Sequence, residues 1–177
     1  MKATANNTAL LFIDLINDFQ FDGGEKLYVH TKQILPNLIK LKKFAIEKNI
    51  PIIYVNDHYK LWTSDADTII DHCYNEKSKE IIDALKPDEQ DYFFIKPQHS
   101  AFFQTPLKSL LNDLDKTHLI IAGIAGDICV LFTAKDAYMY QFTMSIPNNC
   151  IASEEKEGND YALYLMNTVM KADITPI

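Results

Sequence analysis

Residues Ile120–Val130 read IIAGIAGDICV, and this stretch is the centre of the predicted fold. An apolar run typical of a buried strand leads into Gly123 and Gly126, then into Cys129, and an apolar helical segment follows. A strand, a tight glycine turn and a helix in that order are typical of α/β proteins. The cysteine therefore stands at the start of a predicted helix, just beyond the carboxyl end of a predicted strand.

The rest of the chain alternates between short apolar runs and helical patterns. Strands are predicted at Thr8–Leu15, Pro51–Asn56, Tyr92–Lys96, His118–Ala122 and Phe142–Ile146, with a short sixth near Ile174. Helices are predicted at Leu35–Lys48 with Pro36 in the first turn, at Ser78–Leu85, at Pro106–Leu114, from the glycine turn to Tyr140, and from an N-cap at Ser153 to Met170. Asn17–Gly24 is a predicted loop, and Asp57–Tyr74 is predicted as a long loop with room for one helical turn. This alternation predicts one α/β domain over residues 1–177 with a parallel sheet.

Composition excludes several classes of protein. The chain has 177 residues and a net charge of −7, and its 17 basic residues are all lysines. A nucleic-acid-binding protein is expected to carry a basic face, so no nucleic-acid partner is predicted. No apolar run reaches the roughly 20 residues of a membrane helix, and the first residues make a poor signal peptide, so we expect a cytoplasmic location and no membrane partner. The three cysteines are too few and too scattered for a disulfide framework.

Three reactive side chains follow the predicted strands. Asp14 closes the first strand, Lys96 closes the third, and Cys129 follows the fourth. In parallel sheets, ligands bind beyond the carboxyl ends of the strands. We therefore expect the three side chains to lie together at one edge of the sheet.

These residue types suit nucleophilic catalysis. A helix N-terminus and a nearby lysine both favour a thiolate, so we expect a lowered pKa for Cys129, while Asp14 can accept the thiol proton. Gly123 and Gly126 permit a tight turn that aims backbone N–H groups at one point, as an oxyanion hole requires. The alternative is a buried structural thiol beside a structural Asp14–Lys96 ion pair.

Aromatic residues in loops at the same edge are candidate pocket walls. They are Phe19, Trp62, His99, Phe102 and Phe103. The alternative for each is packing of its loop onto the sheet, and for His99 a hydrogen bond within a loop.

Several segments resemble the isochorismatase-like cysteine hydrolase superfamily. The likeness rests on ALLFIDLINDF (9–19), KPQHSAFFQTPL (96–107), LIIAGIAGDICVLFTAKDAY (119–138) and SEEKEGNDYALYLM (153–166). The resemblance implies a three-layer Rossmann-like fold, with helices on both faces of a six-stranded, mostly parallel sheet. It also implies an Asp14–Lys96–Cys129 triad, a cis peptide between Ile124 and Ala125, and an oxyanion hole made by the N–H groups of Ala125 and Cys129.

The function that this resemblance implies is hydrolysis of an amide-type C–N bond in a small molecule through a thioester, without a cofactor, by a homo-oligomer. Two departures matter: Gly126 stands where the family commonly has threonine, and the Asp-x-His zinc pair of nicotinamidases is absent. Asp57–His58 and Asp71–His72 are adjacent pairs instead, so no metal is predicted. The alternatives are a metal-assisted nicotinamidase, a vinyl-ether hydrolase of the isochorismatase type, or a catalytically silent binding or scaffold member.

Overall fold

A parallel sheet forms the middle of the computed structural model, which describes residues 6–177. Its strands are β1 (Thr8–Ile13), β2 (Ile52–Asp57), β3 (Tyr92–Lys96), β4 (His118–Ile124), β5 (Thr143–Ser145) and β6 (Ile151–Ala152). The order is β3-β2-β1-β4-β5, every pair is parallel, and β6 pairs with the end of β4 beyond β5. The predicted six-stranded parallel sheet is confirmed. The signal-peptide prediction rests on residues 1–15, of which the first five lie outside the described part.

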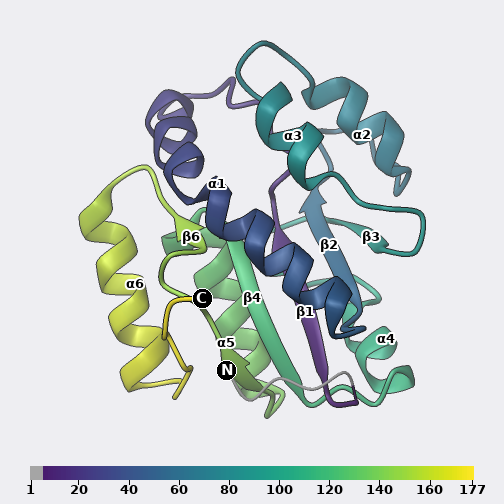
Figure 1. Ribbon diagram of the computed structural model, residues 1–177, viewed down its shortest axis with the longest axis vertical. Helices are drawn as coiled ribbons and strands as arrows, with labels where there is room; N and C mark the ends of the chain where they lie inside the picture. The colour runs from purple at the N-terminus through teal and green to yellow at the C-terminus, as the bar shows by residue number, and fades with distance from the viewer. Residues whose placement is uncertain (1–5) are drawn as a thin grey trace.

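Helices cover both faces of this sheet. They are α1 (Gly24–Glu47), α2 (Ala66–Cys73), α3 (Lys79–Leu85), α4 (Leu107–Asp113), a π-helical turn η1 (Gly126–Val130), α5 (Leu131–Met139) and α6 (Lys156–Thr168). Figure 1 shows α1 crossing the near face of the sheet and α5 behind β4. The arrow of β2 points towards the end of the molecule where α2, α3 and the start of α1 gather. The three layers of the predicted fold are therefore present.

The central strand β1 shows why its sequence is continuously apolar. Leu10 and Phe12 are buried among the side chains of α1 and α3. Leu11 and Ile13 are buried in the opposite cluster, which contains residues of α4, α5 and α6. A strand covered on both faces has no polar side, so its apolar residues run on without alternation.

The prediction that the first helix begins at Leu35 is wrong, because α1 begins at Gly24. Leu27 and Thr31 extend its buried face towards the N-terminus. The Thr31 hydroxyl donates a hydrogen bond to the carbonyl of Leu27 at 2.7 Å. A polar residue on the buried face hid the helical period. Pro36 lies inside the helix and removes one backbone hydrogen bond there. The helix continues through it because the neighbouring residues Leu35 and Leu38 are buried against the sheet.

The segment predicted as a loop at Asp57–Tyr74 contains α2. Asp65 caps this helix, since its carboxylate accepts the N–H of Thr68 at 2.9 Å. Ile69 and Cys73 are its two buried residues, and they pack in a small cluster with Ile16. Only two of its eight residues are buried, which is too few to show a helical period.

The C-terminal elements also differ from the prediction. The sixth strand is β6, whereas near Ile174 there is a single bridge between Asp173 and Ser145. Helix α6 begins at Lys156 and has no side-chain cap. Ser153 does not cap it, because Ser153 Oγ accepts the N–H of Asp127 at 3.0 Å and thereby holds the turn before α5.

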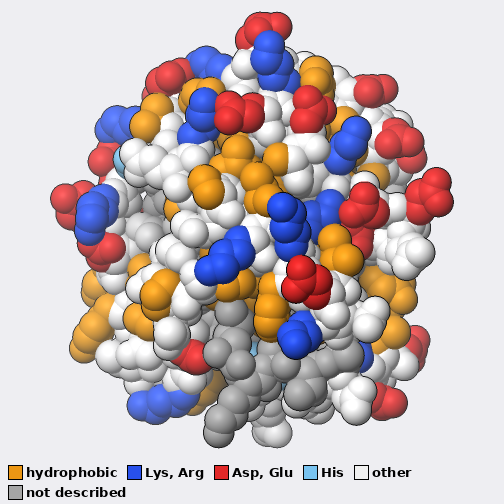
Figure 2. Space-filling model, in the orientation of Figure 1, with side chains coloured by type: hydrophobic (Ala, Val, Ile, Leu, Met, Phe, Trp, Pro, Cys, Tyr) orange, Lys and Arg blue, Asp and Glu red, His pale blue; other side chains and the backbone are white. Residues whose placement is uncertain are grey.

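The surface carries charges of both signs. On the face drawn in Figure 2, lysine and acidic side chains are interspersed with apolar ones. Across residues 6–177, the helices are all too short or too polar to span a bilayer.

Candidate active site

The three predicted reactive side chains meet at the carboxyl edge of the sheet. Lys96 Nζ lies 2.9 Å from Asp14 Oδ2 and 3.4 Å from Cys129 Sγ. The Asp14 and Lys96 side chains are 8% and 4% exposed, and Cys129 is half-buried. The Asp14 carboxylate is also close enough to the Cys129 thiol to raise its pKa. One ammonium group thus contacts both a carboxylate and a thiol.

The carboxylate of Asp14 is fixed from two sides. Asp14 follows β1 with a left-handed backbone (φ 51°), and its Oδ1 accepts the N–H of Asp57 at 2.8 Å while Oδ2 faces Lys96. The next turn is held by Asn56, which accepts the N–H of Ile16 at 3.1 Å and donates to its carbonyl at 2.9 Å. The end of β2 therefore positions the residue that follows β1.

The glycines around Cys129 make room for close packing. Gly123 has φ 131°, and a methyl group added there would lie 2.1 Å from the carbonyl oxygen of Ile13 on β1. A methyl group at Gly126 would lie 2.1 Å from Asn159 Oδ1. The space that a threonine at position 126 would need is therefore filled by Asn159 of α6.

Several backbone N–H groups of the turn that carries Cys129 are already hydrogen-bonded. The peptide bond between Ile124 and Ala125 is cis. The N–H groups of Ile128 and Val130 both donate to the carbonyl of Ala125 at 3.1 Å, and that of Asp127 donates to Ser153. The amides of Ala125 and Cys129, the predicted oxyanion donors, are not among these three.

The expected lowering of the Cys129 pKa is wrong. Burial raises the pKa of Cys129 above the usual thiol value, the Asp14 carboxylate raises it further, and Lys96 only partly opposes them. For Lys96, burial alone would lower the pKa, but Asp14 and Cys129 reverse the effect, and the net pKa is raised. Since Asp14 already balances the lysine, a thiolate would leave this site with a net negative charge. Burial and the Asp14 carboxylate therefore favour the neutral thiol of Cys129 over its thiolate.

A cavity of about 410 Å³ opens onto the triad. Besides the triad, its lining comprises Asn17, Phe21, Leu27, Asp57, His58, Tyr59, Pro97, Gln98, His99, Ala125, Ile128 and Glu154. This volume suits a small molecule.

Of the five aromatic and histidine residues predicted for the pocket, the structure places only His99 in its lining. His99 Nδ1 lies 3.8 Å from Cys129 Sγ. Phe19 and Phe102 are buried in the two opposite cores instead. Trp62 and Phe103 are exposed and do not line the cavity; the Trp62 ring stacks on that of His58 with centroids 4.0 Å apart. A loop sequence does not show which way its side chains turn, and this caused the error.

Sequence reasoning missed Phe21, Tyr59 and Glu154 as lining residues. Phe21 belongs to the same loop as Phe19. An aromatic side chain is expected to be buried, but that of Phe21 is 45% exposed. The Tyr59 hydroxyl donates to the carbonyl of Ile16 at 3.2 Å, and the side chain is half-buried. Glu154 lies beyond the end of β6, so correct placement of that strand could have identified it.

The residues considered for a metal site do not form one. His58 Nδ1 accepts the N–H of Lys60 at 2.9 Å, and its Nε2 lies 3.9 Å from Asp57. Asp71 and His72 are exposed on α2, where the His72 ring contacts Tyr59. Within residues 6–177, no three His, Cys, Asp or Glu side chains are grouped to hold a metal ion. The zinc site of nicotinamidases does not fit these residues.

Comparison with known proteins identifies the family of this chain. The family model for the isochorismatase domain matches residues 8–175. The chain is 52% identical over 167 residues to YaaI of Bacillus subtilis (strain 168), an uncharacterized isochorismatase family protein, covering 94% of this chain and 92% of that protein. It is 33% identical over 142 residues to a probable inactive nicotinamidase of Arabidopsis thaliana, covering 74% and 72%.

Among solved structures, the nicotinamidase PncA of Bacillus subtilis superposes with a TM-score of 0.72 at 26% identity, over 96% of this chain and 99% of that one. The match of the family model to residues 8–175 and the 52% identity to YaaI show that the chain belongs to the isochorismatase family of hydrolases.

Proposed function

We propose that this protein is a cysteine-dependent hydrolase that cleaves an amide-type C–N bond of a small molecule through a thioester. The observation that carries the proposal is the position of Lys96 Nζ, 2.9 Å from Asp14 and 3.4 Å from Cys129, at a cavity of about 410 Å³. A structural ion pair alone would not need a half-buried thiol beside it, open to a cavity.

The first half of the reaction forms the thioester. Asp14 takes the proton of the Cys129 thiol as Sγ attacks the carbonyl carbon, and Lys96 stabilises the developing thiolate. The carbonyl oxygen becomes an oxyanion that accepts hydrogen bonds from the N–H groups of Ala125 and Cys129. Asp14 then returns its proton to the leaving nitrogen as the C–N bond breaks.

The second half regenerates the enzyme. Asp14 takes a proton from a water molecule, whose oxygen attacks the thioester carbon. The C–S bond breaks, the acid product leaves, and the proton on Asp14 returns to Sγ. This sequence explains a thiol that is neutral at rest: the carboxylate that raises its pKa is also the base that removes its proton.

Ammonia release tests the proposal. Wild-type protein and a Cys129→Ala variant are incubated with small primary amides, ureas and carbamates, and acylated protein is sought by mass spectrometry after rapid acid quenching. We expect ammonia from the wild type only, and an acyl adduct on the peptide that contains Cys129. Absence of ammonia from every compound would favour the silent binding or scaffold alternative.

A further inference from the structure

The cavity lining is acidic beyond the triad. Asp57 and Glu154 line it together with Asp14. Lys96 is the single lysine in this described lining, and the chain contains no arginine. Because Lys96 is bound to Asp14 at 2.9 Å, its charge is balanced, and the carboxylates of Asp57 and Glu154 remain. Apart from its histidines, the cavity therefore has a net negative charge.

The Glu154 carboxylate lies against the backbone of Gly23. Gly23 adopts a left-handed conformation (φ 87°), and a methyl group added there would lie 2.1 Å from Glu154 Oε2. Absence of a side chain at residue 23 thus makes room for the carboxylate. Within residues 6–177, Glu154 forms no ion pair, since the neighbouring lysine, Lys26, is bound to Glu155 instead. The half-buried carboxylate of Glu154 therefore lies in the cavity wall without a direct ion pair, although Lys26 is near enough to feel its charge.

The second carboxylate and the aromatic rings favour the same ligand charge. The Asp57 side chain is 55% exposed, and among residues 6–177 it accepts only the N–H of Tyr59, at 3.3 Å, besides its contact with His58. Phe21 and Tyr59 line the cavity as well, and aromatic faces attract cations. A carboxylate on the ligand would face like charges here, whereas an ammonium group could form the direct ion pair that Glu154 lacks.

We propose that the substrate is a cationic amide, a small molecule that carries a protonated amine beside its scissile C–N bond, and that Glu154 and Asp57 select that amine. This inference rests on the proposed amide hydrolysis at Cys129. The two carboxylates determine specificity and do not take part in bond cleavage.

Three amides of similar size and different charge provide the test. They are γ-aminobutyramide (cationic), valeramide (neutral) and succinamate (anionic). Ammonia release gives kcat/KM for each, and thermal stabilisation of the Cys129→Ala variant measures binding without turnover. We expect the order cationic, neutral, anionic in both measurements, with a preference for the cation of about tenfold or more that declines as salt is added.

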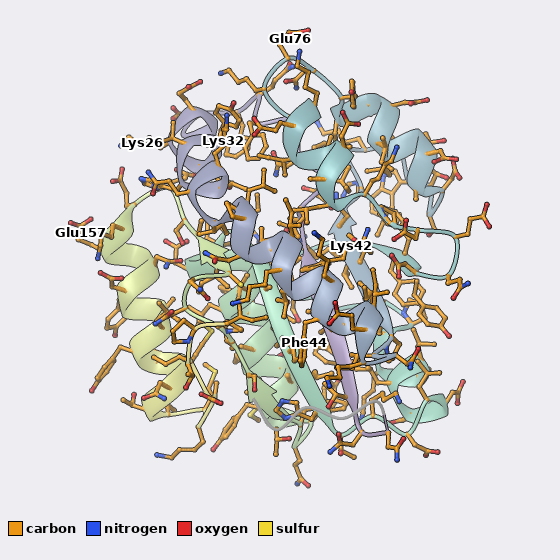
Figure 3. The ribbon with its side chains drawn as sticks, in the orientation of Figure 1. Lys26, Lys32, Lys42, Phe44, Glu76 and Glu157 are labelled. Carbon is orange, nitrogen blue, oxygen red and sulfur yellow. The ribbon has the colours of Figure 1, made fainter. Side chains whose placement is uncertain are left out.

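Variants assign the preference to particular residues. Glu154→Gln and Asp57→Asn keep the shape of each side chain and remove its charge, so each is expected to reduce the cationic-to-neutral ratio of kcat/KM about fivefold. Glu157→Gln is the matched control, because Glu157 points outward from the first turn of α6 (Figure 3) and does not line the cavity. That variant should leave the ratio unchanged.

The possible results separate the two proposals. Hydrolysis with the neutral or anionic amide preferred would overturn the cationic substrate and leave amide hydrolysis standing. A ratio unchanged by Glu154→Gln and Asp57→Asn would overturn the role of these carboxylates. Absence of ammonia from every amide, together with selective stabilisation of Cys129→Ala by the cationic one, would refute the hydrolysis and retain a cation-binding cavity. Absence of both signals would refute both.

Discussion

Replacing Asp14 with asparagine is expected to move two properties of Cys129 in opposite directions. Hydrolysis should fall by about a thousandfold, because the base that removes the thiol proton is lost. Alkylation of Cys129 by iodoacetamide should become faster, because the carboxylate raises the pKa of this thiol and its removal lowers that pKa again. In the variant, the thiolate replaces Asp14 as the counter-ion of Lys96.

The size of the effect follows from the distances. The two contacts of Lys96 Nζ, 2.9 Å and 3.4 Å, place Asp14 Oδ2 and Cys129 Sγ no more than about 6.3 Å apart. Two unit charges at that separation repel by about 2.6 kcal/mol at an effective dielectric constant of about 20, which corresponds to about two pKa units. Lower basicity makes a thiolate less nucleophilic, so the alkylation rate below the pKa should rise about tenfold.

Peptide mapping by mass spectrometry can follow the three cysteines separately over a range of pH. The rate for wild-type Cys129 should still be increasing above pH ~8.5, the ordinary thiol pKa, and the Asp14→Asn profile should lie at lower pH. Lys96→Met is the opposite comparison: it removes the favourable charge, so alkylation should be slower than in wild type. Thermal unfolding of each variant checks that it is folded. Alkylation of Asp14→Asn that is unchanged or slower would refute the charge balance deduced for this site.

Four further predictions concern the surroundings of the triad. Gly126→Thr should destabilise the protein by about 1–3 kcal/mol in urea unfolding, and Asn159→Ala in the same chain should recover part of the loss, because the two side chains compete for one space. Cys73 and Cys150 are buried, each with a pKa raised by burial to about 12, so iodoacetamide should label them only once denaturant unfolds the chain. Dialysis against a chelator should leave hydrolysis intact, and its loss would contradict the metal-free proposal. Light scattering should show a homo-oligomer, in which the half-exposed ring of Phe132 on α5 is covered.

The strands and the meeting of the triad were predictable for one physical reason. Strands covered on both faces are continuously apolar, so the first polar residue after each run marks the edge of the sheet. Asp14, Lys96 and Cys129 are such residues or follow them closely. Sheet order was not needed, because all parallel strands end at the same edge.

The cavity walls and the start of α1 could not be predicted in this way. Thr31 is buried in α1 through a bond to its own helix, and this polar residue broke the apolar pattern. Phe19 and Phe21 are two positions apart in one loop, yet the first enters the core and the second lines the cavity. The backbone conformation decides which of the two side chains is buried. The left-handed φ of 54° at Phe19 could not be predicted from the sequence, because an aromatic residue rarely adopts it.

The wrong prediction for the Cys129 pKa and the proposed choice of substrate have the same physical cause: the positive charge of Lys96 is already paired with Asp14. Considered alone, a lysine beside a cysteine stabilises a thiolate and attracts anions. Here Asp14 lies closer to the ammonium group than Cys129 does, 2.9 Å against 3.4 Å, and neutralises it. A thiolate and a substrate carboxylate would then each add an unbalanced negative charge beside Asp57 and Glu154. The same balance that keeps the nucleophile protonated at rest therefore disfavours anionic substrates and favours an amide that brings its own positive charge.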